Sequence, residues 1–219
     1  MTVELEIARD ANEAERRAGK LVAERARAAI ESSRFSVALS KAPPAMLQAF
    51  VAGVTSWDAI DVYQVDERAA AAGTPHRNLS AIVASLPAEA LGSLRPMPVE
   101  APDLDDAARL YEVELPEALD LVHLGLGVDG HTASLVPGDP VLDVRDRRVA
   151  VTEEYVGHRR LTLTVPALDS AREIIWLVTG EEKRDALARL LEGDESIPAA
   201  RITNPSQLVV ADEAAASSA

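Results

Sequence analysis

Apolar residues recur along this chain with two spacings, one typical of helices and one typical of buried strands. The longest helical pattern covers residues 12–33, where Ala14, Ala18, Leu21 and Val22 fall on one face. Similar patterns predict shorter helices at residues 43–51, 78–86, 103–115 and 181–191. Short, almost continuous apolar runs predict strands at residues 35–39, 60–65, 119–124, 174–179 and 207–210, with 149–152 and 161–165 as later strands near a sheet edge.

The alternation of strands and helices predicts an α/β fold with a mainly parallel sheet flanked by helices. No internal repeat or long flexible linker divides the sequence, so residues 1–219 are expected to form a single domain. Ligands of such sheets bind beyond the carboxyl ends of the strands. The loops that follow residues 39, 65, 124 and 179 are therefore the expected positions of a functional site.

Composition narrows the classes of protein that this sequence can encode. The 219 residues are 47% hydrophobic and carry a formal net charge of -14, which argues against nucleic acid or an anionic membrane as a general partner. Cysteine is absent, and no apolar run approaches the roughly 20 residues needed to cross a bilayer. The first residues do not resemble a signal peptide, so a cytoplasmic location is expected. An anionic ligand would have to meet a local cluster of cations.

The segment GLGVDGHTASLVPG, residues 125–138, admits two interpretations. Its glycines fit the pattern G-x-G-x-x-G, but dinucleotide binding needs a long helix directly afterwards, and the Pro-Gly dipeptide interrupts it. Alternatively, the glycines turn the chain sharply and place His131 at the start of a short helix, where a neutral imidazole can accept a proton. Asp129 or Asp66 could orient that ring. A histidine that only caps the helix is the structural alternative.

Several blocks of the sequence resemble those of the 6-phosphogluconolactonases. DLVHLGLGVDGHTASLVPGDPVL is similar to the signature of that family, and VYQVDER, RNL, RRLTLTVPAL, WLVTGEEKRDAL and IPAARI are similar to its other blocks, in their order along the chain. The resemblance implies a hydrolase that opens 6-phospho-D-glucono-1,5-lactone to 6-phosphogluconate in the oxidative pentose phosphate pathway. It also implies a Rossmann-like fold shared with sugar-phosphate isomerases and CoA transferases, and no metal or organic cofactor.

The resemblance also implies roles for individual residues. His131 matches the general base, and Asp66 and Arg68 belong to an Asp-Glu-Arg block that lines the pocket. Arg160 and Lys183 match basic positions placed for the substrate phosphate. The other matches to the substrate site are Glu67, Asn78, Asp129 and Gly130. The charged residues could instead be ordinary solvated surface. Four scattered histidines without a paired metal-binding spacing argue against a zinc site.

Three places depart from the pattern of that family, and one of them is the block after Asp-Glu-Arg, with Ala69-Ala70 and Arg77 before Asn78 where serine is usual. The family carries Ser-Gly-Gly-x-Thr-Pro after its first strand, whereas this chain has SKAPPAML, in which Ser40 is kept and Lys41 and Ala42 replace the glycines. Lys41 either substitutes for part of the lost backbone N–H cradle or points to solvent. His123 stands within a predicted strand where the family usually has an aliphatic residue, and we interpret it as packed rather than catalytic.

Three functions are therefore compared. The first is an active lactonase acting on a phosphorylated sugar lactone, as a monomer or weak homo-oligomer. The second is a related phosphosugar isomerase or deaminase, a class that typically carries an Asn-Glu pair after Asp-Gly-His, which HTASLVPG lacks. The third is a non-catalytic or altered-specificity sugar-phosphate binder, which the missing glycines favour.

Overall fold

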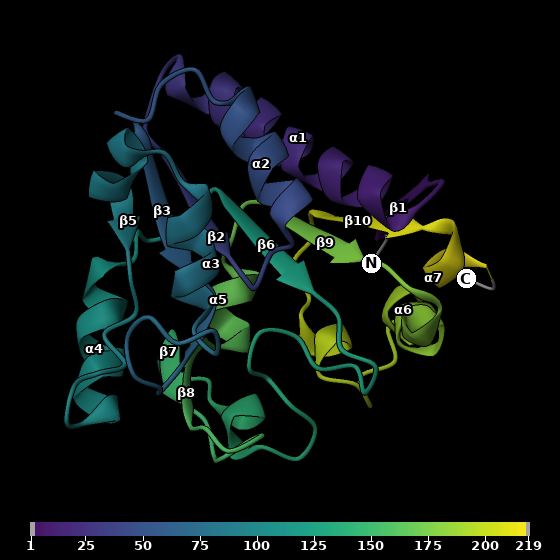
Figure 1. The fold of residues 1–219 in the computed structure, drawn as a ribbon. Helices are drawn as coiled ribbons and strands as arrows, with labels where there is room; N and C mark the ends of the chain where they lie inside the picture. Colours follow the sequence, from purple (N-terminus) through teal and green to yellow (C-terminus); the bar gives the residue numbers. More distant parts are fainter. Residues whose placement is uncertain (1–2, 218–219) are drawn as a thin grey trace.

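The computed structural model describes residues 3–217, and its centre is a seven-stranded sheet (Figure 1). From one edge to the other, the order is β1 (Glu4–Ala8), β10 (Gln207–Asp212), β9 (Ile174–Val178), β6 (Leu121–Gly125), β2 (Phe35–Leu39), β3 (Ile60–Gln64) and β5 (Leu94–Arg95). Neighbouring strands in this sheet all run parallel. The predicted α/β architecture with a mainly parallel sheet is confirmed.

Two apolar cores lie on opposite faces of the sheet because successive strand residues point to opposite sides. On β6, for example, Leu121 packs into one core while Val122 and Leu124 pack into the other. The helices that surround the sheet are α1 (Ala11–Ile30), α2 (Pro44–Gly53), α3 (Asn78–Ser85), α4 (Leu104–Glu114), α5 (Val165–Asp169), α6 (Arg184–Glu192) and α7 (Glu213–Ala216). None of the helices within residues 3–217 is both long and apolar enough to cross a membrane.

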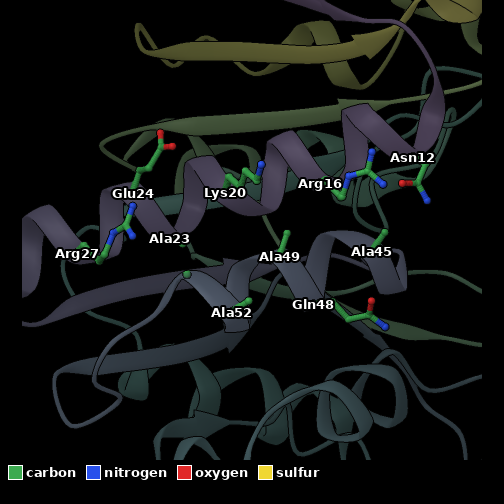
Figure 2. Close-up of a pocket in the computed structure, with 11 residues that line it drawn as sticks. Asn12, Arg16, Lys20, Ala23, Glu24, Arg27, Ala45, Gln48, Ala49 and Ala52 are labelled. Carbon is green, nitrogen blue, oxygen red and sulfur yellow. The ribbon is translucent and has the colours of Figure 1, made fainter.

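Helices α1 and α2 pack against each other almost backbone to backbone. A Cβ atom at Gly19 of α1 would lie 2.2 Å from the carbonyl oxygen of Met46 in α2, so only glycine fits there. Figure 2 shows the small side chains of Ala23, Ala49 and Ala52 where the two helices meet. The predicted helix at residues 12–33 is thus confirmed, with its alanine-rich face serving close helix packing as well as the core.

A second, smaller sheet corrects one prediction. Strands β7 (Val149–Val151) and β8 (Arg160–Leu163) do not lie at an edge of the main sheet; with β4 (Asp66–Arg68) they form a separate antiparallel sheet in the order β4-β8-β7. Leu163 also donates its N–H to the carbonyl oxygen of Val65, which joins β8 to the link between β3 and β4. The small sheet therefore carries Asp66, Arg68 and Arg160 past the carboxyl end of the main sheet.

Two strands of the main sheet, β1 and β5, were not predicted. β1 reads ELEIA, in which the alternating glutamates obscure a strand at the sheet edge, and β5 has only two residues. Both acquire their strand character from pairing with a neighbour, β10 for β1 and β3 for β5. Such pairing joins residues far apart in the sequence, so short local patterns do not reveal it.

Candidate active site

A cavity of about 290 Å³ lies at the carboxyl edge of the main sheet. Its walls come from the loops after β2 and β6, from β4 and β8, from the start of α3 and from the turn before α6. The residues that line it are Ser40, Lys41, Asp66, Arg68, Asn78, Gly125, Leu126, Gly127, His131, Ala133, Arg160 and Lys183. Every loop expected to carry the site contributes to it, and of the candidate residues only Glu67, Asp129 and Gly130 are absent from its lining.

The loop that follows β6 holds the imidazole of His131 in one orientation. Nδ1 of His131 lies 2.5 Å from Oδ1 of Asp129, and the same carboxylate oxygen accepts the backbone N–H of His131 at 3.1 Å. Burial alone would raise the pKa of the Asp129 carboxyl, but the hydrogen bonds from His131 lower it below its ordinary value. An ionised Asp129 takes Nδ1 as its donor, so Nε2 is the ring nitrogen left free of Asp129 for proton exchange.

The glycines of this loop make room for the histidine. A Cβ atom at Gly127 would lie 2.1 Å from Nδ1 of His131, and Gly127 donates its N–H to the carbonyl oxygen of His131 at 2.7 Å. Gly130 adopts a left-handed backbone with φ of 79°, and a Cβ there would meet Ile197 at 2.4 Å. The G-x-G-x-x-G spacing thus shapes a turn that presents His131, which supports the second of the two interpretations.

The prediction of a short helix starting at His131 is wrong. Thr132 and Leu135 pair their backbones with each other, Ala133 between them has φ of 52°, and the hydroxyl of Thr132 donates to the carbonyl oxygen of Gly125. No helix begins until a short turn at Pro140–Asp143. The argument that a helix N-terminus keeps His131 neutral therefore does not apply, and the helix that a dinucleotide fingerprint requires is also absent from residues 126–139.

Asp66 does not orient His131; its partners are different. Its carboxylate accepts hydrogen bonds from the hydroxyl of Ser134 at 2.6 Å and from Nδ2 of Asn78 at 3.1 Å. The side chain is buried, and burial raises the pKa of the Asp66 carboxyl despite the hydrogen bond from Ser134. Sequence reasoning missed Ser134 as a site residue, although it stands only three residues after His131; only the fold shows that it reaches Asp66 in β4.

Glu67 also departs from its expected place, because it is fully buried and does not line the cavity. Its carboxylate accepts the backbone N–H groups of Asn78 and Leu79, both at 2.8 Å, which are free donors at the start of α3. It also forms an ion pair with Nε of Arg77 at 3.2 Å. Glu67 therefore anchors α3, and through it holds the side chain of Asn78 at the cavity.

Positive charge dominates the cavity. Four cationic side chains line it, those of Lys41, Arg68, Arg160 and Lys183, against one carboxylate, that of Asp66. None of the four takes part in an ion pair within residues 3–217. In a chain with a net charge of -14, this cluster is the local cationic site that an anionic ligand would need.

The two arginines of the cluster are held by neighbours rather than by acids. Nη1 of Arg68 donates to the carbonyl oxygen of His76 at 2.7 Å and to Oδ1 of Asn78 at 3.1 Å. Arg160 donates to the carbonyl oxygen of Tyr155 at 3.2 Å, and its guanidinium carbon lies 5.0 Å from the centre of the Tyr155 ring. Burial, together with the nearby charge of Arg68, lowers the pKa of Arg160 below its ordinary value. The sequence held no signal for Tyr155, which approaches Arg160 only through a tight turn.

Metal-binding donors do not converge in the described part of the chain. No group of three His, Cys, Asp or Glu side chains within residues 3–217 is placed to hold a metal ion. The larger hollow of about 590 Å³ in Figure 2, between α1 and α2, contains none of the candidate site residues. The chemistry suggested by the sequence is thus concentrated in the cavity at the sheet edge.

Comparisons with known proteins place the chain in a known family. Residues 9–211 match the family described as glucosamine-6-phosphate isomerases/6-phosphogluconolactonase. The chain is 35% identical over 196 residues to the 6-phosphogluconolactonase of Synechocystis sp., which covers 82% of this chain and 81% of that relative. It is also 34% identical over 182 residues to the 6-phosphogluconolactonase of Mesorhizobium japonicum, covering 77% of this chain and 76% of that relative.

Solved structures show the same fold. The 6-phosphogluconolactonase of Thermotoga maritima has a TM-score of 0.80 at 23% identity, covering 96% of this chain and 99% of that one. A monomeric glucosamine-6-phosphate deaminase has a TM-score of 0.86 at 20% identity, covering 98% and 99%. The fold alone therefore does not separate the two activities. The family match over residues 9–211 and the curated relatives show that the chain belongs to the family of glucosamine-6-phosphate isomerases and 6-phosphogluconolactonases.

Proposed function

We propose that this chain hydrolyses 6-phospho-D-glucono-1,5-lactone to 6-phosphogluconate, a step of the oxidative pentose phosphate pathway, with His131 as the general base. Relatives that are 34–41% identical and named 6-phosphogluconolactonase, from bacteria and mammals, support lactone hydrolysis. The observation that carries the assignment of His131 is its position on the cavity wall with Nδ1 bound to Asp129 and Nε2 left to accept a proton.

The proposed reaction needs no covalent intermediate. Nε2 of His131 takes a proton from a water molecule while the water oxygen bonds to the lactone carbonyl carbon. The resulting tetrahedral intermediate expels the ring oxygen, which takes the proton back from His131 as the ring opens. Asp129 stabilises the imidazolium that exists between the two proton transfers.

The cationic residues are proposed to stabilise two negative charges. One is the charge of the substrate phosphate, and the other develops on the lactone carbonyl oxygen during the reaction. Arg160 and Lys183 are proposed to bind the phosphate, Arg160 through its planar pair of N–H groups and Lys183 as a point charge. Arg68 is proposed to face the carbonyl oxygen as negative charge develops on it. The backbone N–H groups of Gly127 and Gly130 are less suited to that task, because both already donate to carbonyl oxygens of the loop.

Asp66, Ser40 and Asn78 complete the proposed substrate site. Burial raises the pKa of the Asp66 carboxyl, and its oxygens already accept hydrogen bonds from Ser134 and Asn78. Asn78 and Ser40 offer neutral polar groups on the cavity wall. We also propose that the protein acts in the cytoplasm, as a monomer or weak homo-oligomer and without a cofactor.

A coupled assay tests this proposal. The lactone is generated enzymatically, and its disappearance is compared with the spontaneous rate with and without the protein. His131→Ala should lower turnover by roughly 10²–10⁴-fold, the usual contribution of a general base. Wild-type turnover in the purified variant would remove His131 from the mechanism.

The alternatives give different results in the same experiment. A non-catalytic binder would bind 6-phosphogluconate without accelerating lactone loss. A deaminase would release ammonia from glucosamine 6-phosphate, an activity we consider because a deaminase shares the fold. Ammonia release without lactone hydrolysis would replace the lactonase proposal.

A further inference from the structure

The hairpin that joins β7 to β8 contains a strained turn next to residues of the candidate active site. Tyr155 and His158 pair their backbones, and between them Val156 and Gly157 have φ of 52° and 76°. Two successive positive φ angles suit Asn-Gly, whereas a β-branched residue such as valine rarely adopts one. Val156 is also 76% exposed, so packing of its own side chain does not hold the turn. Contacts made by the neighbouring residues must therefore hold it.

Tyr155 holds the guanidinium of Arg160 through both its backbone and its ring. Its carbonyl oxygen accepts a hydrogen bond from Nη2 of Arg160 at 3.2 Å, and the guanidinium carbon lies over the phenol ring, 5.0 Å from the ring centre. Within residues 3–217, Nη1 donates only a long bond of 3.4 Å to the hydroxyl of Ser134, and the buried Nε has no hydrogen-bond partner. The orientation of Arg160 therefore depends mainly on Tyr155.

The same ring packs against His131. The two ring centres are 6.1 Å apart and the ring planes are inclined by 61°, which is the edge-to-face arrangement that aromatic pairs favour. His131 and Arg160 line the cavity, whereas Tyr155 does not. The influence of Tyr155 on a ligand therefore passes through these two side chains.

The other end of the turn packs on a second part of the site. The ring of His158 lies 5.6 Å from that of His76, between the ring centres. The carbonyl oxygen of His76 in turn accepts Nη1 of Arg68 at 2.7 Å. The hairpin is thus fixed on both sides by residues that contact the cationic groups of the cavity.

We propose that Tyr155 is a positioning residue, which holds the guanidinium of Arg160 at a fixed place beside the imidazole of His131. A phosphate bound by Arg160 would then orient the lactone carbonyl toward the base, because the distance between cation and base is set in advance. This inference rests on the proposed function, in which Arg160 binds the phosphate and His131 activates water.

The first test measures binding of 6-phosphogluconate by isothermal titration calorimetry. Tyr155→Leu removes the ring but keeps the backbone carbonyl, and it should weaken binding by roughly three- to tenfold. Tyr155→Phe keeps an aromatic face and should bind within about twofold of the wild type. Val156→Asn is the matched control in the same turn; it should raise the stability to urea and leave binding unchanged.

A double-mutant cycle separates positioning from a general effect on the structure. In an Arg160→Ala background, Tyr155→Leu should weaken 6-phosphogluconate binding no further, since the group that Tyr155 holds is gone. Circular dichroism checks that each variant is folded. If Tyr155→Leu does not fold, Tyr155→Met, which keeps apolar volume without an aromatic face, takes its place in the cycle.

Kinetics then tests the contact with His131. Tyr155→Leu should lower kcat for both phosphorylated and unphosphorylated gluconolactone, and raise KM only for the phosphorylated one. The proposal is overturned if Tyr155→Leu binds 6-phosphogluconate like the wild type, or if it weakens binding equally with and without Arg160. A wild type that binds 6-phosphogluconate without hydrolysing the lactone would overturn the lactonase proposal instead, and the binding cycle would still decide whether Tyr155 positions Arg160.

Discussion

Replacing His123 by leucine should change how the stability of the protein depends on pH. In the folded chain, burial holds the pKa of His123 at about 4, well below its ordinary value of 6.5. Between those pH values the unfolded chain binds a proton that the folded chain does not, so stability falls as pH falls from about 6.5 to about 4. A difference of this size corresponds to about 3 kcal/mol at the lower end and about 2 kcal/mol at pH 5.

His123→Leu removes this group, and with it two buried ring nitrogens that have no hydrogen-bond partner within residues 3–217. At pH 7 we therefore expect the variant to be at least as stable as the wild type, with a gain on the order of 1 kcal/mol if leucine fits the site. At pH 5 its advantage should grow by about 2 kcal/mol. Other titrating groups, including Asp66 with its raised pKa, are common to both proteins and cancel in the comparison.

Urea unfolding followed by circular dichroism at pH 7, 6 and 5 measures this difference. Two-state behaviour and equal m-values in the two proteins are required for the comparison. If the free energies of unfolding of the wild type and His123→Leu remain parallel from pH 7 to pH 5, His123 is not buried as a neutral, unpartnered ring, and the reasoning above is refuted.

Four further predictions concern the candidate active site. Asp129→Asn should lower turnover by roughly tenfold or more with little change in KM, because an amide does not stabilise the imidazolium; an unchanged turnover number would separate Asp129 from the chemistry. Arg160→Ala should raise KM for the phosphorylated lactone by roughly 10–100-fold and hardly affect unphosphorylated gluconolactone, whereas equal effects on both substrates would make Arg160 structural. Lys41→Ala should raise the same KM by roughly two- to fivefold in low salt and less in high salt; no change in low salt would mean that Lys41 points to solvent. Dialysis against a strong chelator should leave activity unchanged, and a loss restored by zinc or magnesium would contradict the absence of a metal requirement.

Much of the fold could be predicted from local patterns. The run LVHLG of β6 and the amphipathic pattern of α1 each carry enough apolar periodicity to identify the element without its neighbours. The general rule for parallel sheets then placed the site at the strand ends, and Ser40, Arg68, His131 and Lys183 do line one cavity.

The helix expected after His131 failed for a physical reason. Residues 131–136, HTASLV, have helix-compatible composition, but the Thr132 hydroxyl bonds back to Gly125 and Ala133 takes a left-handed conformation. Local propensity is a weak preference that a few tertiary hydrogen bonds outweigh. In the same way, the short strands 149–151 and 160–163 were recognised as strands, but the sheet to which they belong depends on Asp66–Arg68, which lies more than eighty residues earlier.

The α/β class, the strand-end position of the site and the residue types available there follow from periodicity and chain direction, so local patterns were enough to predict them. Which partner each carboxylate binds depends instead on how the chain folds. Asp129 rather than Asp66 contacts His131, and Asp66 instead receives the hydroxyl of Ser134. The tertiary structure also left the ring nitrogens of His123 buried without a hydrogen-bond partner among the described residues. Hydrogen bonds and burial depend on distances of a few ångströms between segments far apart in the chain, and no local pattern encodes them.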